Sequence, residues 1–373
     1  MKAMILAAGK GTRVMPITKK IPKPMIPIIN QPVMELIIEQ LKKHGFNEFI
    51  TNVSHLAPVI EDYFKDGSRL GVHIAFSWEG HFEGDQWKGT ALGSAGGMQL
   101  IQSRSGFFND TFAVLCGDAV IDVDFTEALK FHREKGAIAT IIMKQVPKDE
   151  VSSYGVVCTE EDGRIIDFQE KPSPEEAQSD MINTGIYLFE PEIFDFIPLQ
   201  GEYDIGSDLF PALVKAGAPF YGVSLPFQWI DIGKIQDLWH VTRMALCGEI
   251  NGFSMPGTEI SPHVWVGANV HIDDNANITG PVYIGGSTIV EKNTTIRGPS
   301  LIHSGCVIEE GAEIEQALIW HHSRVSGAAN IHKKIVFGPH CIDFQGRAVN
   351  LKEGKLDWLI SDTRCKTEQK APF

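Results

Sequence analysis

Apolar runs and amphipathic stretches alternate along the first part of the chain. Residues 3–8 and 48–53 have the pattern of buried strands, and residues 33–44 between them carry apolar side chains at helical spacing. The same patterns predict further strands at 72–77, 111–116 and 137–143, and helices at 57–64 and 125–135. This alternation predicts a mainly parallel sheet with helices on both faces, and the expected fold class is α/β with a Rossmann-like mixed sheet. Ligands of such sheets bind outside the carboxyl ends of the strands.

The alternation becomes less regular after residue 150. Residues 155–159 and 164–169 flank Glu160-Glu161-Asp162-Gly163, which is typical of a hairpin turn. Further strands are expected at 185–189 and 221–225, and helices at 206–216 and 234–247. We therefore expect a first domain over residues 1–247 and a linker over residues 248–256.

A different period follows the linker, because an aliphatic residue recurs at every sixth position. These residues are Ile260, Val266, Ile272, Ile278, Ile284, Val290, Ile296, Ile302, Ile308 and Ile314. The spacing slips by one at Ile319 and resumes at Val325 and Ile331. Neither a helix nor an ordinary sheet has this period, whereas the hexapeptide coils of a parallel β-helix do. We predict a parallel β-helix of the left-handed type over residues 257–345, then a partly helical tail over 346–373 with a short helix in 351–361.

Composition excludes some partners. The formal net charge of −14 argues against nucleic-acid binding, which needs a basic surface. The six cysteines are scattered without a C-x-x-C pair, so a zinc or redox site is not expected. No apolar run has the length of a membrane span, and the apolar start is too short for a signal peptide. We expect a cytoplasmic protein with no membrane partner, and the β-helix favours a homo-oligomer.

A glycine-rich turn follows the first predicted strand, in Gly9-Lys10-Gly11-Thr12-Arg13. Glycines allow backbone N–H groups to approach a polyphosphate closely, although neither the P-loop nor the dinucleotide fingerprint fits, and a plain loop is an equal alternative. Further along, Pro22 and Pro24 fix the backbone around Lys23, which favours a positioned charge.

This segment resembles the signature G-x-G-T-R-[LFV]-x-P-[LI]-T-x-x-x-P-K-P of NDP-sugar pyrophosphorylases, a nucleotidyltransferase family whose members often carry a hexapeptide-repeat domain. Leu92-Gly93-Ser94-Ala95-Gly96-Gly97 is similar to the family element L-G-T-A-G-A, which contacts the base. The resemblance implies that the nucleotide is bound by Leu6, Ala7, Ala8, Gly9, Gly11, Thr12, Arg13, Lys23 and Gly93. It also implies catalytic roles for Arg13, Lys23 and Lys171.

Later motifs also resemble this family. Gly155 lies in a Y-G segment, Glu170-Lys171-Pro172 matches E-K-P, and Asn183 begins N-[TS]-G-[IV]-Y. By resemblance, Gly155, Glu170, Lys171 and Asn183 bind the sugar phosphate. Cys116-Gly117-Asp118 and Trp229-Ile230-Asp231-Ile232-Gly233 match elements whose aspartates bind magnesium, which suits Mg²⁺ because it takes one or two carboxylates plus phosphates. The expected cofactor is Mg²⁺, held by Asp118 and Asp231.

The resemblance implies transfer of a nucleotidyl group from a nucleoside triphosphate to a hexose 1-phosphate. Several motifs are similar to the cyanobacterial type of UDP-glucose pyrophosphorylase, which favours UTP and glucose 1-phosphate. GTP with mannose 1-phosphate is the alternative, and a non-catalytic regulatory subunit is a further one. One departure concerns the base. Residues 80–91 are longer than the usual connection, and both Glu79 and Lys88 are candidates for the base-reading side chain.

Two further functional alternatives concern histidines of the β-helix. The β-helix could be an acyltransferase with His303 or His332 as its base, although single histidines on such a coil are usually surface residues. His321-His322 could bind a metal, but a surface pair is favoured because no further ligand lies at suitable spacing.

Overall fold

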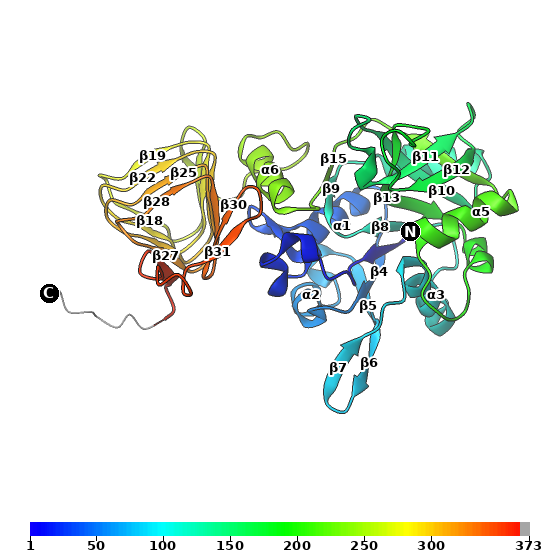
Figure 1. The fold of residues 1–373 in the computed structure, drawn as a ribbon, viewed down its shortest axis with the longest axis horizontal. Helices are drawn as coiled ribbons and strands as arrows, with labels where there is room; N and C mark the ends of the chain where they lie inside the picture. The colour runs from blue at the N-terminus through cyan, green and yellow to red at the C-terminus, as the bar shows by residue number, and fades with distance from the viewer. Residues whose placement is uncertain (366–373) are drawn as a thin grey trace. The chain divides into compact units, whose positions relative to one another are not determined.

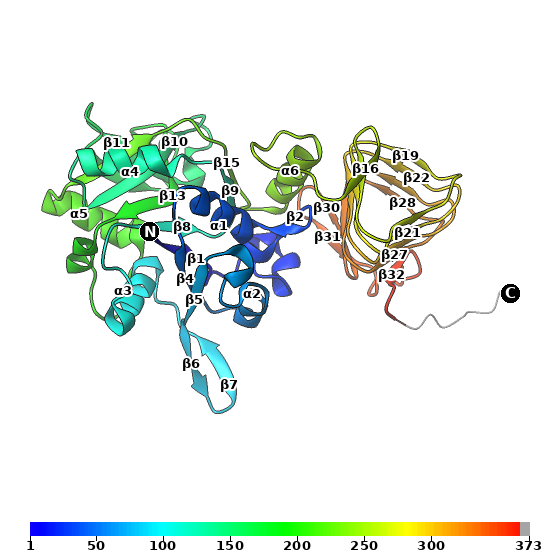
Figure 2. The same cartoon turned by 180° about the vertical axis from the view of Figure 1, so that it is seen from behind.

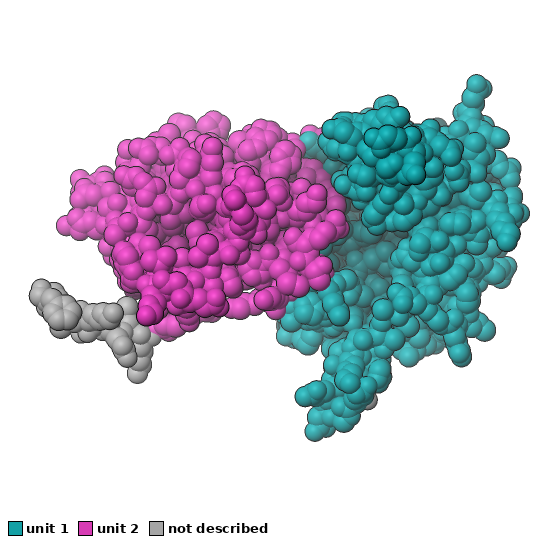
Figure 3. All heavy atoms as spheres, viewed as in Figure 1, with its two compact units in different colours: residues 1–10, 21–25, 33–229 teal, residues 11–20, 26–32, 230–373 magenta. Residues whose placement is uncertain are grey.

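The computed structural model describes residues 1–365, and the chain divides into two compact units. Unit 1 contains residues 1–10, 21–25 and 33–229, and unit 2 contains residues 11–20, 26–32 and 230–373 (Figure 3). This division differs from the expected contiguous domains 1–247, 248–256 and 257–345. Two N-terminal segments and the helix that precedes the linker group with the C-terminal repeats. Each unit is described by itself.

Unit 1 is built on a mixed sheet with the order β12-β11-β13-β8-β1-β4-β5, and β10 pairs with β13 and β14 (Figure 1). Strands β8, β1, β4 and β5 run parallel, whereas β13 is antiparallel to both β8 and β10. The strands are β1 Lys2–Leu6, β4 Glu48–Val53, β5 His73–Trp78, β8 Phe112–Cys116, β10 Ala139–Gln145, β11 Gly155–Thr159, β12 Ile165–Glu170, β13 Met181–Phe189 and β14 Phe220–Ser224. Because four parallel strands end at one edge, the residues that follow them meet there.

The helices of unit 1 are α1 Val33–Lys43, α2 Ala57–Phe64, α3 Ser94–Ser105, α4 Phe125–Glu134 and α5 Phe210–Ala216, with a π-helical turn at Ile205–Leu209 before α5. Helix α1 shows why the sequence forms them, since Val33, Ile37 and Leu41 at helical spacing are buried. Over residues 1–365, none of the helices combines the length and apolarity that a membrane crossing requires.

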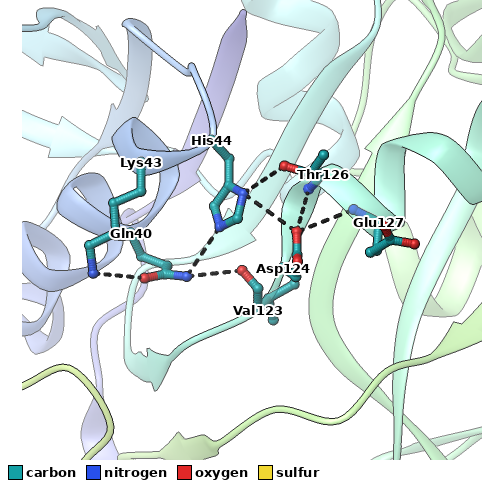
Figure 4. Close-up of polar contacts among 7 residues, drawn as sticks. All are labelled: Gln40, Lys43, His44, Val123, Asp124, Thr126 and Glu127. Carbon is teal, nitrogen blue, oxygen red and sulfur yellow. Dashed lines mark hydrogen bonds and ion pairs between the residues drawn. The ribbon is translucent and has the colours of Figure 1, made fainter.

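A polar network fixes the segment between the short strand β9 (Ala119–Ile121) and helix α4 to the end of α1 (Figure 4). Asp124 caps α4 by accepting hydrogen bonds from the backbone N–H groups of Thr126 and Glu127. From α1, Gln40 Nε2 donates to the Val123 carbonyl at 2.9 Å, and His44 Nδ1 lies 3.0 Å from Thr126 Oγ1. This bracing holds the residues that directly follow Asp118.

Two strands, β6 Gly80–Glu83 and β7 Gln86–Gly89, form an antiparallel hairpin directly after β5. The hairpin projects away from the rest of unit 1 in both views (Figures 1 and 2). It accounts for the long connection that the sequence places between Glu79 and Leu92.

Unit 2 contains three sheets of short parallel strands that stack as successive coils, as in a parallel β-helix (Figure 1). Val264 pairs with Val282 and Val282 with Ser300, so one coil spans three hexapeptides. Ile302 pairs with Ile319, which is the one-residue slip expected from the sequence. The parallel strands are β17 Val264–Val266, β20 Val282–Ile284, β23 Ser300–Ile302, β26 Leu318–Ile319 and β29 Lys334–Phe337; β18 His271–Ile272, β21 Ile289–Val290, β24 Val307–Ile308 and β27 Ser323–Val325; and β19 Asn277–Thr279, β22 Thr295–Arg297, β25 Glu313–Glu315 and β28 Asn330–His332.

Most residues of the six-residue period line the interior of these coils. Ile284, Val290, Ile296, Ile302 and their successors are buried in one apolar cluster. Ile260 is an exception and corrects the expectation, because 53% of its surface is exposed. It lies in β16 (Thr258–Ser261), which pairs antiparallel with β17 and belongs to no coil.

The tail also differs from the expectation. Residues 346–365 form turns and the strands β31 Ala348–Asn350 and β32 Ile360–Asp362 rather than a helix, and residues 366–373 lie outside the described part. Strand β32 pairs antiparallel with β27, and the buried side chains of Leu351 and Ile360 join the apolar cluster of the coils. The tail therefore covers the last coil.

Helix α6 (Ile235–Leu246) packs against the outer surface of β23. Outward-facing Tyr283, Leu301 and Leu318 on the same sheet are buried, although such positions on a coil usually face water. Trp239 of α6 stacks on Phe344, next to β30 (His340–Asp343), with ring centres 4.2 Å apart. Helix α6 is thus an integral part of the β-helical unit.

Candidate active site

A cleft of about 820 Å³ opens at the edge of unit 1 where the parallel strands end. Most of its lining residues lie at or just after the ends of β1, β4, β5 and β8, or between β5 and the start of helix α3. They are Leu6, Ala8, Gly9, Lys10, Asn52, Ser54, His55, Leu56, Glu79, Trp87, Gly89, Thr90, Ala91, Leu92, Gly93, Ser94, Cys116, Asp118 and Glu202. The cleft therefore contains Leu6, Ala8, Gly9, Gly93 and Asp118 of the expected site. Its position is the one at which open α/β sheets bind ligands.

Lys23 and Asp118 form an ion pair at this edge, with Lys23 Nζ beside Asp118 Oδ2. Lys23 begins a short 3-10 turn (Lys23–Met25), and Asp118 follows strand β8. Their side chains are only 12% and 23% exposed, so the charges are positioned rather than freely solvated. The structure thus brings together the proline-flanked lysine and the strand-end aspartate that the sequence singled out.

Glu79 lies inside the cleft and is only 4% exposed. Asn52 Nδ2 donates to Glu79 Oε1 at 2.8 Å, and Asn52 Oδ1 accepts from the backbone N–H of Ala7 at 2.9 Å. Burial raises the pKa of the Glu79 carboxyl, and the hydrogen bond from Asn52 only partly offsets this. Ala7, itself buried, is thereby linked to the cleft through its backbone.

Lys88, the other candidate for reading the base, lies elsewhere. It is on β7, its side chain is 54% exposed, and it forms an ion pair with Glu83 across the hairpin. Of the two side chains that the sequence left open, the structure places Glu79 in the cleft and Lys88 outside its lining.

The start of helix α3 forms part of the wall of the cleft. Gly93 has φ 72°, and a side chain there would strike the carbonyl of Tyr203. Ser94 Oγ donates to Asp204 Oδ2 at 2.7 Å and accepts from the Ile205 N–H at 2.8 Å. These bonds fix the N-terminus of α3, whose partial positive charge favours anions.

The expected sugar-phosphate residues form a neighbouring group around β11 and β12. Gly155 pairs with Glu170, and a Cβ at Gly155 would lie 3.2 Å from Glu170 Oε2. Lys171, with φ 47°, donates to Glu170 Oε1 at 2.5 Å. A Cβ at Gly206, two residues from the Asp204 that holds Ser94, would lie 3.4 Å from Glu170 Oε2. The group is thus connected to the wall of the cleft.

Asn183 of β13 is held by hydrogen bonds with Tyr187 and Gly185. Its Nδ2 donates to Tyr187 Oη at 3.0 Å, and its Oδ1 accepts from the Gly185 N–H at 2.9 Å. Burial raises the pKa of Tyr187 well above its ordinary value, so this phenol stays protonated. None of Gly155, Glu170, Lys171 and Asn183 lines the cleft itself.

Gly11, Thr12, Arg13 and Asp231 belong to unit 2. Around Gly233, a Cβ would lie 3.0 Å from Asp231 Oδ2 and 3.8 Å from Arg13 Nη1. Arg13 and Asp231 are therefore brought together, although they are far apart in the sequence. Asp237 Oδ2 is also close to Gly233, and it caps α6 by accepting from the Lys234 N–H at 2.7 Å. Thr12 is exposed in a 3-10 turn, and the Gly11 carbonyl accepts from Thr18 Oγ1 at 2.8 Å.

The two histidines considered as acyltransferase bases lie in different environments. His303 is 1% exposed, and its ring lies against Trp320 and His321. His332 is exposed beside Glu315. Within residues 1–365, no group of three or more His, Cys, Asp or Glu side chains is placed to hold a metal ion. His321 and His322 are therefore not part of such a group.

Several lining residues carry no sequence motif and were not anticipated. Asn52, Ser54 and His55 could have been found only from their place at or just after the end of the predicted strand at residues 48–53, because strand ends line such sites. Trp87 enters the cleft from the hairpin, whose pairing the sequence did not reveal.

Comparison with known proteins adds three findings. Residues 2–246 match the family described as Nucleotidyl transferase. The chain is 55% identical over 365 residues to a UTP–glucose-1-phosphate uridylyltransferase of Synechocystis, and the alignment covers 98% of this chain and 94% of that protein. It is 36% identical over 239 residues to the mannose-1-phosphate guanylyltransferase catalytic subunit beta of Xenopus tropicalis, covering 64% of this chain and 62% of that protein.

A solved structure is similar as well. A crystal structure of UDP-glucose pyrophosphorylase complexed with UDP-glucose matches with a TM-score of 0.55 and 23% identity, over 65% of this chain and 96% of that one. At this identity the likeness shows a shared fold alone.

Proposed function

Because the chain belongs to the nucleotidyl transferase family, we propose that it makes UDP-glucose and pyrophosphate from UTP and glucose 1-phosphate. It is an enzyme that transfers a nucleotidyl group to a sugar phosphate. The observation that carries the proposed reaction is the Lys23–Asp118 pair at the edge of the cleft. The choice of UTP and glucose rests on the Synechocystis relative, whose similarity extends through the β-helix.

The proposed reaction is a direct displacement. A phosphate oxygen of glucose 1-phosphate forms a bond to the α-phosphorus, while the bond to the bridging oxygen breaks and pyrophosphate leaves with the electron pair. The attacking phosphate is already ionised near neutral pH, so no general base is needed. The protein then acts by positioning and by neutralising charge. We assign Arg13 and Lys23 to the phosphates of the nucleotide and Lys171 to the sugar phosphate.

We propose that Asp118, which supplies a carboxylate in the cleft, holds a magnesium ion, because Mg²⁺ is usually held by one or two carboxylates together with substrate phosphates. The family resemblance names Asp231 as the second carboxylate. When bound, the ion would neutralise negative charge on the phosphates. Lys23 beside Asp118 would add its own positive charge at the same place.

We assign recognition of the base to Glu79. Its carboxylate can accept the single N–H of uracil, and in its protonated form, which burial favours, it can also donate to a carbonyl. Guanine offers an N–H and an amino group to the same carboxylate. Mannose-1-phosphate guanylyltransferase is therefore the second candidate, favoured by the acidic side chain and the Xenopus relative.

A substrate matrix tests the proposal. Four nucleoside triphosphates are combined with glucose, mannose and N-acetylglucosamine 1-phosphates, and pyrophosphate release is measured. The expected maximum is UTP with glucose 1-phosphate. A maximum with GTP and mannose 1-phosphate would establish the second candidate, and no release with any pair would leave a regulatory role.

Two variants test the assigned residues. Asp118→Ala and Arg13→Ala should each lower turnover at least about a hundredfold while folding normally, because each removes charge stabilisation at the phosphates. Asp274→Ala in the β-helix and Arg104→Ala at the end of α3 are matched controls, since both side chains are exposed outside the cleft. Near-normal turnover of either site variant would refute its assignment.

We further propose that the enzyme acts in the cytoplasm as a homo-oligomer. The cysteines within residues 1–365 form no disulfide bonds with one another, which fits a reducing compartment. Light scattering at several protein concentrations would measure the oligomeric state.

A further inference from the structure

The hairpin β6–β7 has its root at the cleft and its turn away from it. Gly80 and Gly89 pair at the root, and Glu83 and Gln86 pair at the outer end. Glu79, which precedes the root, is fixed by the Ser54 hydroxyl and the Thr90 N–H, which donate to its carbonyl at 3.1 and 3.2 Å. The hairpin is therefore attached directly to the residue assigned to the base.

Trp87 of the hairpin lines the cleft, as does Gly89 at the root. Its ring lies against the backbone of Gly80, where a Cβ would come within 2.5 Å of Trp87 Cζ2. On another side it contacts the ring of Trp78 edge to face, with centres 4.9 Å apart. Trp78 is held in turn by a hydrogen bond from its Nε1 to Glu61 of α2. The indole of Trp87 is thus held by contacts with Trp78 of strand β5 as well as with the hairpin.

This position puts an aromatic surface next to Glu79. Trp87 packs on Gly80, the residue that follows Glu79, and both side chains line the same cleft as Leu92 and Gly93. Every nucleobase has a flat π-face, so an aromatic wall binds bases without distinguishing them, whereas a carboxyl group distinguishes their hydrogen-bonding edges.

We propose that Trp87 is a binding residue for the nucleobase, and that the hairpin supplies this aromatic wall of the base subsite. The proposal rests on the proposed function, in which a nucleoside triphosphate occupies the cleft. It assigns affinity to Trp87 and selectivity between bases to Glu79.

The experiment measures binding and turnover of the full-length chain with Mg²⁺. Trp87→Ala should weaken binding of UTP at least about tenfold and raise its KM in proportion. The KM for glucose 1-phosphate and kcat should change little, because the wall contacts neither the sugar nor the phosphates. The ratio of UTP to GTP use should stay the same, whereas Glu79→Gln should change it.

A fluorescence titration gives a second readout that does not need turnover. Addition of UTP and Mg²⁺ without sugar phosphate should change the tryptophan emission of the wild type, and Trp87→Phe should lose most of this change while keeping most of the affinity. Trp87→Phe also serves if the alanine variant does not fold. Gln86→Ala is the matched control, because Gln86 is exposed on the same strand and does not line the cleft.

The outcomes separate this proposal from the proposed function. Unchanged UTP affinity in Trp87→Ala, or an undiminished emission change in Trp87→Phe, would overturn the role of Trp87. A fall in kcat with unchanged UTP affinity would also overturn it and would indicate a closing motion of the hairpin. A wild type that releases no pyrophosphate but shows the Trp87-dependent emission change would contradict the proposed reaction and leave the base subsite standing.

Discussion

Glu79 is assigned to the base, but its buried carboxyl group lowers the stability of the folded chain when it is ionised. Its carboxyl group is buried with one hydrogen bond from Asn52, and burial raises its pKa above the ordinary value of 4.5. A carboxyl with a raised pKa binds more protons in the folded chain than in the unfolded chain. The folded state therefore loses stability as the pH rises from 4.5 through the raised value.

Glu79→Gln should remove this loss. The amide oxygen can still accept from Asn52, and it carries no charge to desolvate. The variant's gain in Tm over the wild type should grow as the pH rises from 4.5 and level off above the raised pKa, measured by thermal unfolding at several pH values. Glu83→Gln in the same hairpin is the control. Lys88 lowers the pKa of the exposed Glu83, so any pH dependence there has the opposite sign. A gain that does not vary with pH would contradict the prediction.

The site residues differ in how far the sequence could reveal them. Lys23 and Asp118 lie in motifs, and their pairing confirms that the two motifs meet. Asn52 lies in no motif. Its role comes from two hydrogen bonds, to Ala7 and Glu79, that exist only once β1, β4 and β5 are side by side. The sequence could not choose between Glu79 and Lys88, because the choice depends on how β6 pairs with β7.

At the scale of elements, the six-residue period predicted the coils because each aliphatic side chain must fill the same column. The exceptions lie where a coil has no neighbour. Ile260 fits the period but precedes the first coil and is exposed, whereas Leu351 and Ile360 lie outside the period and are buried against the last one. Periodicity describes a repeated environment, and the ends of the β-helix are not repeated.

The interior column also makes a prediction about stability. Ile302 is fully buried between Ile284 and Ile319, which pair with it on the adjacent coils. Ile302→Ala should lower the free energy of unfolding by about 2–5 kcal/mol, measured by chemical denaturation, because it leaves a cavity. Ile289→Ala is the matched control, since Ile289 points outward from its coil and is 44% exposed. Equal effects of the two variants would show that the column does not carry the stability of the β-helix.

At the scale of the whole chain, the segment from Gly9 to Pro24 that resembles the family signature is divided between the two units. Lys23 belongs to unit 1, whereas Arg13 groups with the β-helix. Within unit 2, the turn at Gly338 lies near Lys20, where a Cβ would be 3.9 Å from Lys20 Nζ. Burial and the positive charges of Lys19 and Lys20 lower the pKa of His340 in the same turn. The β-helix therefore contacts the segment that carries Arg13.

Helix α6 provides a second connection between the β-helix and Arg13. This connection can be tested by replacing Trp239. The helix begins just after Gly233, beside Arg13 and Asp231, and Trp239 fixes it to Phe344. Trp239→Ala should lower kcat about tenfold or more by loosening Arg13 and Asp231, while UTP affinity changes less because the cleft of unit 1 is untouched. Phe344→Ala should have a similar effect, and the double variant should be little worse than either, since both remove one stacking contact. Trp358→Ala is the control, because that ring is 61% exposed. If Trp239→Ala lowered Tm but left kcat unchanged, the contact would stabilise unit 2 without positioning Arg13, and the β-helix would have no part in catalysis through α6.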